Sequence, residues 1–111
     1  MQTDIFANGI ELDNPLRVFV DDAMKDVERW LGDASRGPVS ARVEIGRPSS
    51  HHNSGKIFYA EANLHIGGEL LRASCEHEDL RNAITDVKHE LERQIKKFKE
   101  RNRDLSRQPQ E

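Results

Sequence analysis

The stretch DLRNAITDVKHELERQIKKFKERNR, residues 79–103, decides the fold of this chain. It contains no Gly and no Pro. Its apolar residues recur at steps of three and four, which is the period of one helical face. They are Leu80, Ala83, Ile84, Val87, Leu91, Ile95 and Phe98. A helix with one apolar face needs a partner surface, so we expect the remaining elements to cover it.

The second half of this stretch is strongly basic. Between residues 93 and 103, six basic residues stand against one acid, Glu100. The six are Arg93, Lys96, Lys97, Lys99, Arg101 and Arg103. Residues 1–35 instead hold eight acidic and three basic residues, so a net charge of −3 conceals a polarised chain. Because the distribution of charge matters more than its sum, we expect a positive field near the end of this helix.

Length and composition set the class of protein. A chain of 111 residues suits one domain, which we place at residues 1–103, followed by a flexible tail at residues 104–111. With 35% hydrophobic and 33% charged residues, the core is thin and the surface highly charged. The sequence has neither the apolar run of a membrane span nor the start of a signal peptide. A lone cysteine, Cys75, excludes an internal disulfide and fits a reducing cytosol, so we expect a cytoplasmic protein.

The first third of the chain predicts a strand and a helix. Residues 3–7 form a short strand, and Asn8-Gly9 is typical of a turn. We expect Asn14 to be the helix N-cap, with Pro15 at the first helical position and Gly32 just past the end. The apolar face of this helix consists of Leu16, Phe19, Val20, Ala23, Val27 and Leu31, with Trp30 at its border.

Three strands precede the basic helix. Apolar and polar residues alternate over 39–45, 59–66 and 70–75, so each strand has one wet face. Residues 46–55 read as a loop, and Gly67-Gly68 favours a two-residue hairpin turn. The order is β-α-β-β-β-α. Since every element has a single apolar face, we predict an α+β two-layer fold, with both helices on one face of a four-stranded sheet.

Several short motifs in this order resemble one known family. They are NGIELDNPLR at residues 8–17, Gly67-Gly68-Glu69 before an Ala-Ser strand, His77-Glu78-Asp79-Leu80, and LERQIKK at residues 91–97. Together these motifs look like the ribosome hibernation-promoting factor family, which includes the ribosome-associated inhibitor protein Y. The resemblance covers about residues 1–103, and the chain resembles a short form of the family.

The resemblance implies a fold, a partner and a set of RNA contacts. The fold would be like that of double-stranded-RNA-binding domains. The partner would be the small ribosomal subunit, bound in its decoding channel through ribosomal RNA, where messenger and transfer RNA would otherwise sit. The matching contact positions are Lys25 and Arg29 on the first helix, and Lys88, Arg93, Lys96, Lys97 and Lys99 on the second. At position 81, where the family often has Tyr, this chain has Arg81.

Helical spacing groups some of these cations without reference to any family. At 100° per residue, five of them fall on one flank beside the apolar stripe, whereas Arg93 falls on the opposite flank. The five are Arg81, Lys88, Lys96, Lys99 and Arg103. We predict that Arg81 reaches RNA phosphate; the alternative is a surface pair with Glu78 or Thr85. Such a row neutralises phosphates, although cations at a helix C-terminus can also merely complement the helix dipole.

No pattern in the sequence predicts catalysis. His51-His52 lacks neighbouring Cys or carboxylate ligands, and His89-Glu90 begins like a zinc-protease helix but has Arg93 where the second His is needed. Cys75 alternates with core positions, which is typical of an inert thiol. We therefore expect no enzyme activity, no cofactor, no metal, no membrane and no small-molecule substrate.

Three functions fit these observations. The first is a ribosome hibernation factor that excludes messenger and transfer RNA by occupancy. The second is a generic binder of double-stranded RNA, which would recognise the shape of A-form grooves. The third is a protein-interaction module that docks a basic partner on the acidic first helix.

Overall fold

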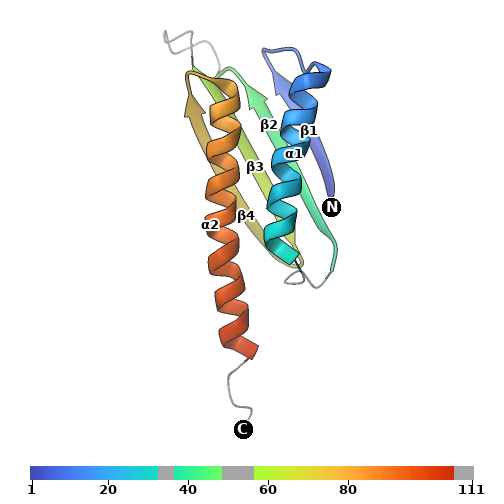
Figure 1. Ribbon diagram of the computed structural model, residues 1–111, viewed down its shortest axis with the longest axis vertical. Helices are drawn as coiled ribbons and strands as arrows, with labels where there is room; N and C mark the ends of the chain where they lie inside the picture. The colour runs from blue at the N-terminus through green and yellow to red at the C-terminus, as the bar shows by residue number, and fades with distance from the viewer. Residues whose placement is uncertain (33–36, 49–56, 107–111) are drawn as a thin grey trace.

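The six predicted elements form in the predicted order (Figure 1). The computed structural model describes residues 1–32, 37–48 and 57–106. The elements are β1 (Gln2–Asn8), α1 (Asn14–Leu31), β2 (Val39–Gly46), β3 (Phe58–Ile66), β4 (Glu69–His77) and α2 (Leu80–Ser106).

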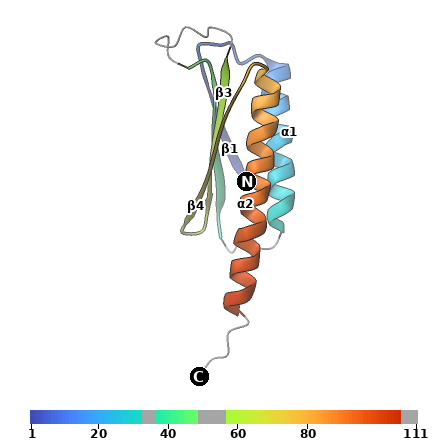
Figure 2. The same cartoon turned by 90° about the vertical axis from the view of Figure 1, so that its left-hand side faces the viewer.

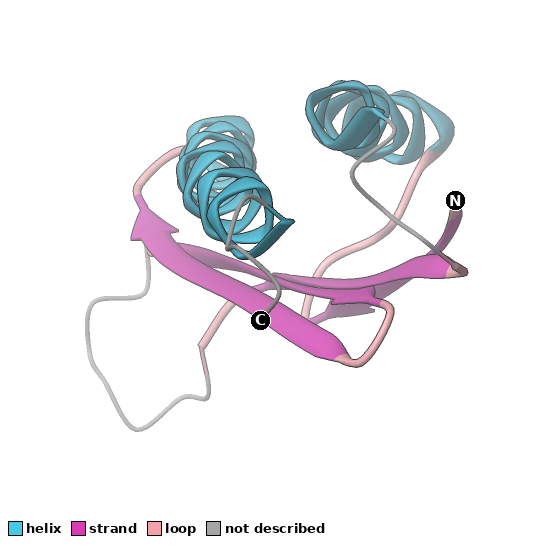
Figure 3. Ribbon diagram, turned by 90° about the horizontal axis from the view of Figure 1, so that it is seen from below, coloured by secondary structure: helices cyan, strands magenta, loops and turns pink. Residues whose placement is uncertain are grey.

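The four strands make one mixed sheet in the order β1-β2-β3-β4. β1 pairs with β2 in parallel, and the other two pairings are antiparallel. A parallel pair needs a crossover connection, and α1 supplies it. Both helices pack against the same face of the sheet, as the views from the side and from below show (Figures 2 and 3). The predicted two-layer α+β architecture is therefore confirmed.

The core lies between this sheet and the two helices. Every apolar position predicted for α2 is buried except Leu80, which is half-buried at the edge of the core. On α1 the structure adds Met24 to the buried set and leaves Phe19 half-buried. Leu91 and Ile95 have no exposed surface, so truncating either to Ala is expected to cost about 2–5 kcal/mol.

The start of α1 differs from the prediction by one residue. Asp13, rather than Asn14, is the N-cap: its backbone is extended and its Oδ1 accepts the N–H of Leu16 at 2.9 Å. Asn14 is thus the first helical residue and Pro15 the second. Both Asp and Asn are good caps, so composition alone does not choose between neighbours. The predicted end is right, since the N–H of Gly32, at φ 51°, donates to the carbonyl of Glu28.

Two glycines meet specific demands of the sheet. The two-residue β3–β4 hairpin forms as predicted, and only its first residue, Gly67, has positive φ, at 57°. That is the φ pattern of a type II′ turn rather than type I′. Gly46 belongs to β2 instead of the following loop, and a Cβ there would collide with the carbonyl oxygen of Asn8. The close pairing of β1 and β2 therefore requires glycine at this position.

The last helix is longer than predicted. It continues to Ser106, so residues 104–106 of the predicted tail are helical. Its final turns extend past the β3–β4 hairpin (Figure 2). Residues 107–111, most of the predicted loop at 46–55, and His51-His52 lie outside the described residues.

Candidate nucleic-acid interface

Three of the predicted RNA-binding cations line the flank of α2 that faces α1. Arg81 stacks on the ring of Phe19, with 5.2 Å between the guanidinium carbon and the ring centroid. Lys88 donates to Asp26 at 3.2 Å. At successive positions along α2, these side chains thus contact residues of α1. Arg81 and Lys88 therefore lie on one flank of α2, as their helical spacing predicts.

Lys99 makes the third contact from α2 to α1. Its Nζ donates to the carbonyl oxygen of Trp30 at 2.8 Å. Trp30 lies in the last turn of α1, where carbonyl groups have no partner within the helix. A cation at this negative end of the helix dipole stabilises α1. Arg81 and Lys99 are 18 residues apart, so the three cations span about 27 Å along α2.

The cations predicted on α1 differ in their surroundings. Lys25 is exposed and makes no ion pair with any described residue. Arg29 is also largely exposed but pairs with Asp26 at 3.2 Å. Asp26 thus binds a cation from each helix, Arg29 and Lys88. No sequence pattern singles out Asp26: its spacing suggests the local pair with Arg29, but nothing in the sequence links it to Lys88, 62 residues away.

Two of the remaining predicted cations, Arg93 and Arg101, lie off this flank. Arg93 chelates Glu90 through Nε at 2.9 Å and Nη2 at 2.5 Å. Arg101 reaches across to the hairpin and binds both carboxylate oxygens of Glu69. The contact with Glu69 places Arg101 on the side of α2 towards β4, and Arg93 lies on that side too, beside Ala73 and Cys75 of β4. Three further exposed cations complete the predicted set: Lys96, Lys97 and Arg103.

Glu90 has the most perturbed carboxyl group on this side. Hydrogen bonds from Arg93 and then Gln94 lower the pKa of Glu90 from 4.5 to about 2. Gln94 also donates to the backbone carbonyl of Arg72, which ties α2 to the edge strand β4. The acid is therefore held in its charged form by its neighbours, as in a structural ion pair. Its low pKa is opposite to what a general acid at neutral pH needs.

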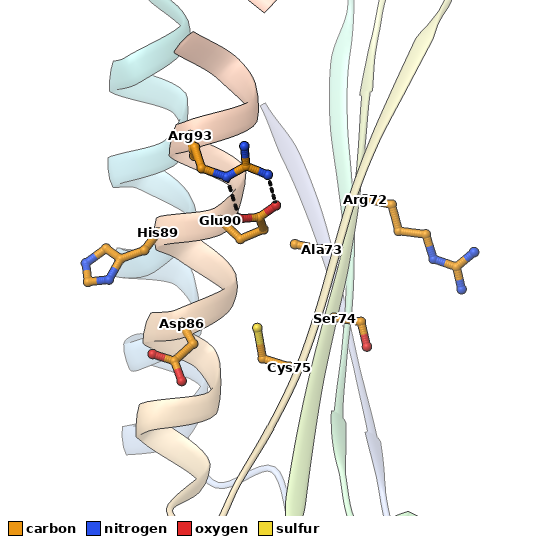
Figure 4. Close-up of a pocket in the computed structure, with 8 residues that line it drawn as sticks. All are labelled: Arg72, Ala73, Ser74, Cys75, Asp86, His89, Glu90 and Arg93. Carbon is orange, nitrogen blue, oxygen red and sulfur yellow. Dashed lines mark hydrogen bonds and ion pairs between the residues drawn. The ribbon is translucent and has the colours of Figure 1, made fainter. Parts of the chain in front are cut away.

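A groove of about 490 Å³ runs between β4 and α2. It is lined by Arg72, Ala73, Ser74, Cys75, Asp86, His89, Glu90 and Arg93. The Cys75 thiol points towards α2, whereas the His89 side chain projects away from Cys75 (Figure 4). Arg93 is bound to Glu90 in the same view. Burial, followed by the charges of Asp86 and Glu90, raises the pKa of Cys75. The groove therefore pairs no base with its only thiol and disfavours the reactive thiolate.

Neither a metal centre nor a membrane span is found in the described part of the chain. No three His, Cys, Asp or Glu side chains converge in a way that could hold a metal ion within residues 1–32, 37–48 and 57–106. None of the helices in these ranges is long and apolar enough to cross a membrane. The described surface does offer a run of cations along α2, whereas α1 carries both acidic and basic side chains.

Comparison with known proteins identifies the family. Residues 3–103 match the family described as Sigma 54 modulation protein / S30EA ribosomal protein. The chain is 31% identical over 105 residues to a ribosome hibernation promoting factor of Pseudomonas putida, covering 95% of this chain and 93% of that protein. It is 30% identical over 102 residues to one of Escherichia coli, covering 91% and 96%. The chain therefore belongs to this family of ribosome-associated translation regulators.

Other relatives are longer than this chain. A ribosome hibernation promotion factor of Deinococcus radiodurans is 28% identical over 93 residues, which cover 84% of this chain but 46% of that protein. The chain thus spans about half the length of that relative.

Solved structures support the same fold. The protein Y N-terminal domain of Thermus thermophilus superposes with a TM-score of 0.73 at 25% identity, covering 88% of this chain and 99% of that one. A ribosomal subunit interface protein of Coxiella burnetii superposes with a TM-score of 0.68 at 17% identity, covering 90% and 99%, and shows likeness of fold alone. The chain therefore shares the β-α-β-β-β-α fold of the protein Y domain, while the likeness to double-stranded-RNA-binding domains stays a prediction.

Proposed function

We propose that this chain binds the small ribosomal subunit in its decoding channel, through ribosomal RNA, and excludes messenger and transfer RNA by occupying their place. One observation carries the proposal: Arg81, Lys88 and Lys99 form a row along one flank of α2 in a chain of this family. A row of cations matches a phosphate backbone without reading its sequence. The proposed role uses no catalysis and requires a cytoplasmic location.

The contacts would come mainly from phosphate neutralisation. By helical spacing the exposed Lys96 lies on the same flank as this row, and Lys25 adds a charge from α1. Lys97 is also exposed, but its charge acts on Glu90 on another side of α2. Aromatic residues are few on this surface, although Trp30 is 46% exposed beside the Lys99 contact. Charge should therefore contribute more than base stacking, and binding should weaken steeply with salt.

The interaction-module alternative is weakened by the contacts of α1. Its acidic character motivated that alternative, yet Asp26 is already paired with Arg29 and Lys88. A basic partner would have to compete with these internal cations. Generic binding of double-stranded RNA uses the same cationic surface, so only a direct comparison of partners separates it from ribosome binding.

Co-sedimentation with ribosomal subunits tests the proposal. The chain should sediment with small subunits and remain bound after nuclease treatment that degrades free RNA. A generic binder should instead prefer free duplexes, and an interaction module should bind neither at high affinity. Preference for a free duplex over the small subunit would overturn the proposal.

A further inference from the structure

Asp26 lies between two of the cations proposed to bind RNA, one from each helix. Its Oδ1 is 3.2 Å from Nη2 of Arg29, and its Oδ2 is 3.2 Å from Nζ of Lys88. The two helices run side by side on the sheet (Figures 1 and 3). One carboxylate therefore holds together a cation of α1 and a cation of α2.

The two cations differ in how firmly the carboxylate engages them. The Lys88 side chain is 22% exposed, so much of its surface is covered at the helix interface. Arg29 is 77% exposed and has only this local partner three residues away. A half-buried ion pair is screened less by salt than an exposed one. The stronger hold is therefore on Lys88.

This arrangement matches what an RNA phosphate would need. A phosphate brings anionic oxygens to positively charged donors, as the Asp26 carboxylate does here. While the Asp26 carboxylate engages Lys88 and Arg29, these two cations neutralise fewer RNA phosphates, so fewer counterions are released from the RNA on binding. A phosphate can make full use of either cation only by displacing the carboxylate.

We propose that Lys88 and Arg29 form a phosphate site whose occupant in the free chain is the Asp26 carboxylate. Asp26 is thus an internal competitor of RNA, and it lowers the affinity of the chain for its ribosomal target. The inference deepens the proposed function and rests on it, because it assumes that this flank of the helix pair meets ribosomal RNA. It assigns a role to an acidic residue inside a cationic surface.

The test compares Asp26→Asn with Asp22→Asn. Asp22 lies one turn earlier on α1, is exposed, and has no ion pair with a described residue. Both substitutions remove one negative charge from the same helix, but only Asp26→Asn releases Lys88 and Arg29. Binding of each variant to purified small ribosomal subunits is measured across a series of monovalent salt concentrations, and thermal unfolding confirms that each variant is folded.

Asp26→Asn should bind about three- to tenfold more tightly than the wild type near 0.1 M salt. Its plot of log affinity against log salt should steepen by about 0.7 to 1.8, which corresponds to one or two more neutralised phosphates. Asp22→Asn should give a smaller gain with an unchanged slope, because it adds no contact. Asp26→Ser, which also lacks the charge, should behave as Asp26→Asn does.

A second variant links the gain to Lys88. Lys88→Gln should weaken binding less in the wild type, where the Asp26 carboxylate already binds the lysine, than in the Asp26→Asn background. In the Asp26→Asn background the same substitution should remove most of the gain in affinity. Such coupling between contacting residues is what a double-mutant cycle detects.

The outcomes separate this inference from the function on which it rests. Equal effects of Asp26→Asn and Asp22→Asn would overturn the inference, since net charge alone would explain them. Weaker binding by Asp26→Asn would also overturn it, because Asp26 would then position Lys88 for RNA. If the wild type and every variant failed to bind small subunits, the proposed function would fall as well.

Discussion

The surroundings of Arg81 depend on the neighbouring helix α1 as well as on its own helix. The structure shows no pair of Arg81 with Glu78 or Thr85; the guanidinium instead lies over the ring of Phe19 of α1 at 5.2 Å. Helical spacing predicted the flank correctly but could not predict Phe19, because that contact depends on how α1 and α2 lie together. The N–H groups of a guanidinium point outward in its own plane. A guanidinium that lies over an aromatic ring therefore keeps them available to a bidentate acceptor such as phosphate.

Replacing Arg81 tests its proposed contact with RNA. Arg81→Ala should weaken binding to small subunits about three- to tenfold, the effect of losing one charged phosphate contact. Arg17→Ala is the matched control, because Arg17 is an exposed cation of α1 outside the proposed contact set. The affinity of each variant for small subunits is measured at low and at physiological salt. If Arg81→Ala matched the wild type under both conditions, Arg81 would not contact RNA.

Glu90 gives a residue-scale prediction about pH. Its hydrogen bonds to Arg93 and Gln94 lower its pKa from 4.5 to about 2. A depressed pKa means that the carboxylate contributes stability above pH 4.5 and loses that contribution as the pH falls through about 2. Glu90→Gln should thus be slightly less stable than the wild type at pH 6, and the difference should shrink steadily below pH 4.5.

Urea denaturation of both proteins at a series of pH values measures this difference. Gln keeps the shape and part of the hydrogen bonding of Glu90, so the comparison isolates its charge. A stability difference that stayed constant from pH 6 to pH 2 would mean that the Arg93 pair does not stabilise the fold.

At the scale of elements, the sequence predicted α2 well because one physical requirement governs it. A helix packed on a sheet must bury a stripe of period 3.6, and Ala83 to Phe98 follow that period. The ends of elements were less predictable. The N-cap of α1 is Asp13 instead of the predicted Asn14, and α2 ends at Ser106, later than predicted. Each end depends on one or two local hydrogen bonds rather than on a repeated pattern.

The packing of the elements also determines which neighbour each predicted cation contacts. Ten cations were expected to bind RNA, and the structure sends them to different sides of the helix pair. Arg101 meets Glu69 on the hairpin, whereas Lys99 meets the last turn of α1. These contacts join segments 32 and 69 residues apart, so no local spacing could reveal them.

The end of α2 offers a prediction that separates folding from binding. Lys99→Gln removes the cation at the C-terminus of α1 and should lower the free energy of unfolding by about 0.3–1 kcal/mol. The double variant Lys96→Gln/Lys97→Gln should leave that free energy nearly unchanged, because neither lysine has such a contact. Chemical denaturation of both variants provides the comparison. Equal stability of all the proteins would show that the Lys99 contact does not stabilise α1.

The same three lysines should set the salt dependence of binding. If about four to six phosphates are neutralised, log affinity should fall against log salt with a slope of about −3 to −5. Replacing Lys96, Lys97 and Lys99 together by Gln should flatten that slope by about 2 to 3. A slope near zero for the wild type would mean that the basic end of α2 is only a solvated terminus.

At the scale of the whole molecule, a net charge of −3 says little about the partner. The acidic first third and the basic helix pack side by side, and Asp26 and Lys88 partly cancel where they meet. The composition predicted this polarity but not the cancellation, because packing brings opposite charges together. The proposed contact with RNA therefore depends on the cations along α2 and not on the net charge of the chain.

The most direct measurement is retention of the chain on purified small ribosomal subunits, with and without messenger RNA and initiator transfer RNA. Occupation of the decoding channel predicts that an excess of the two RNAs displaces the chain, and that prior binding of the chain slows their association. An added duplex of unrelated sequence serves as the control for bulk electrostatic competition and should displace it far less. Simultaneous, undiminished binding of the chain, the messenger and the transfer RNA would contradict the proposed mechanism.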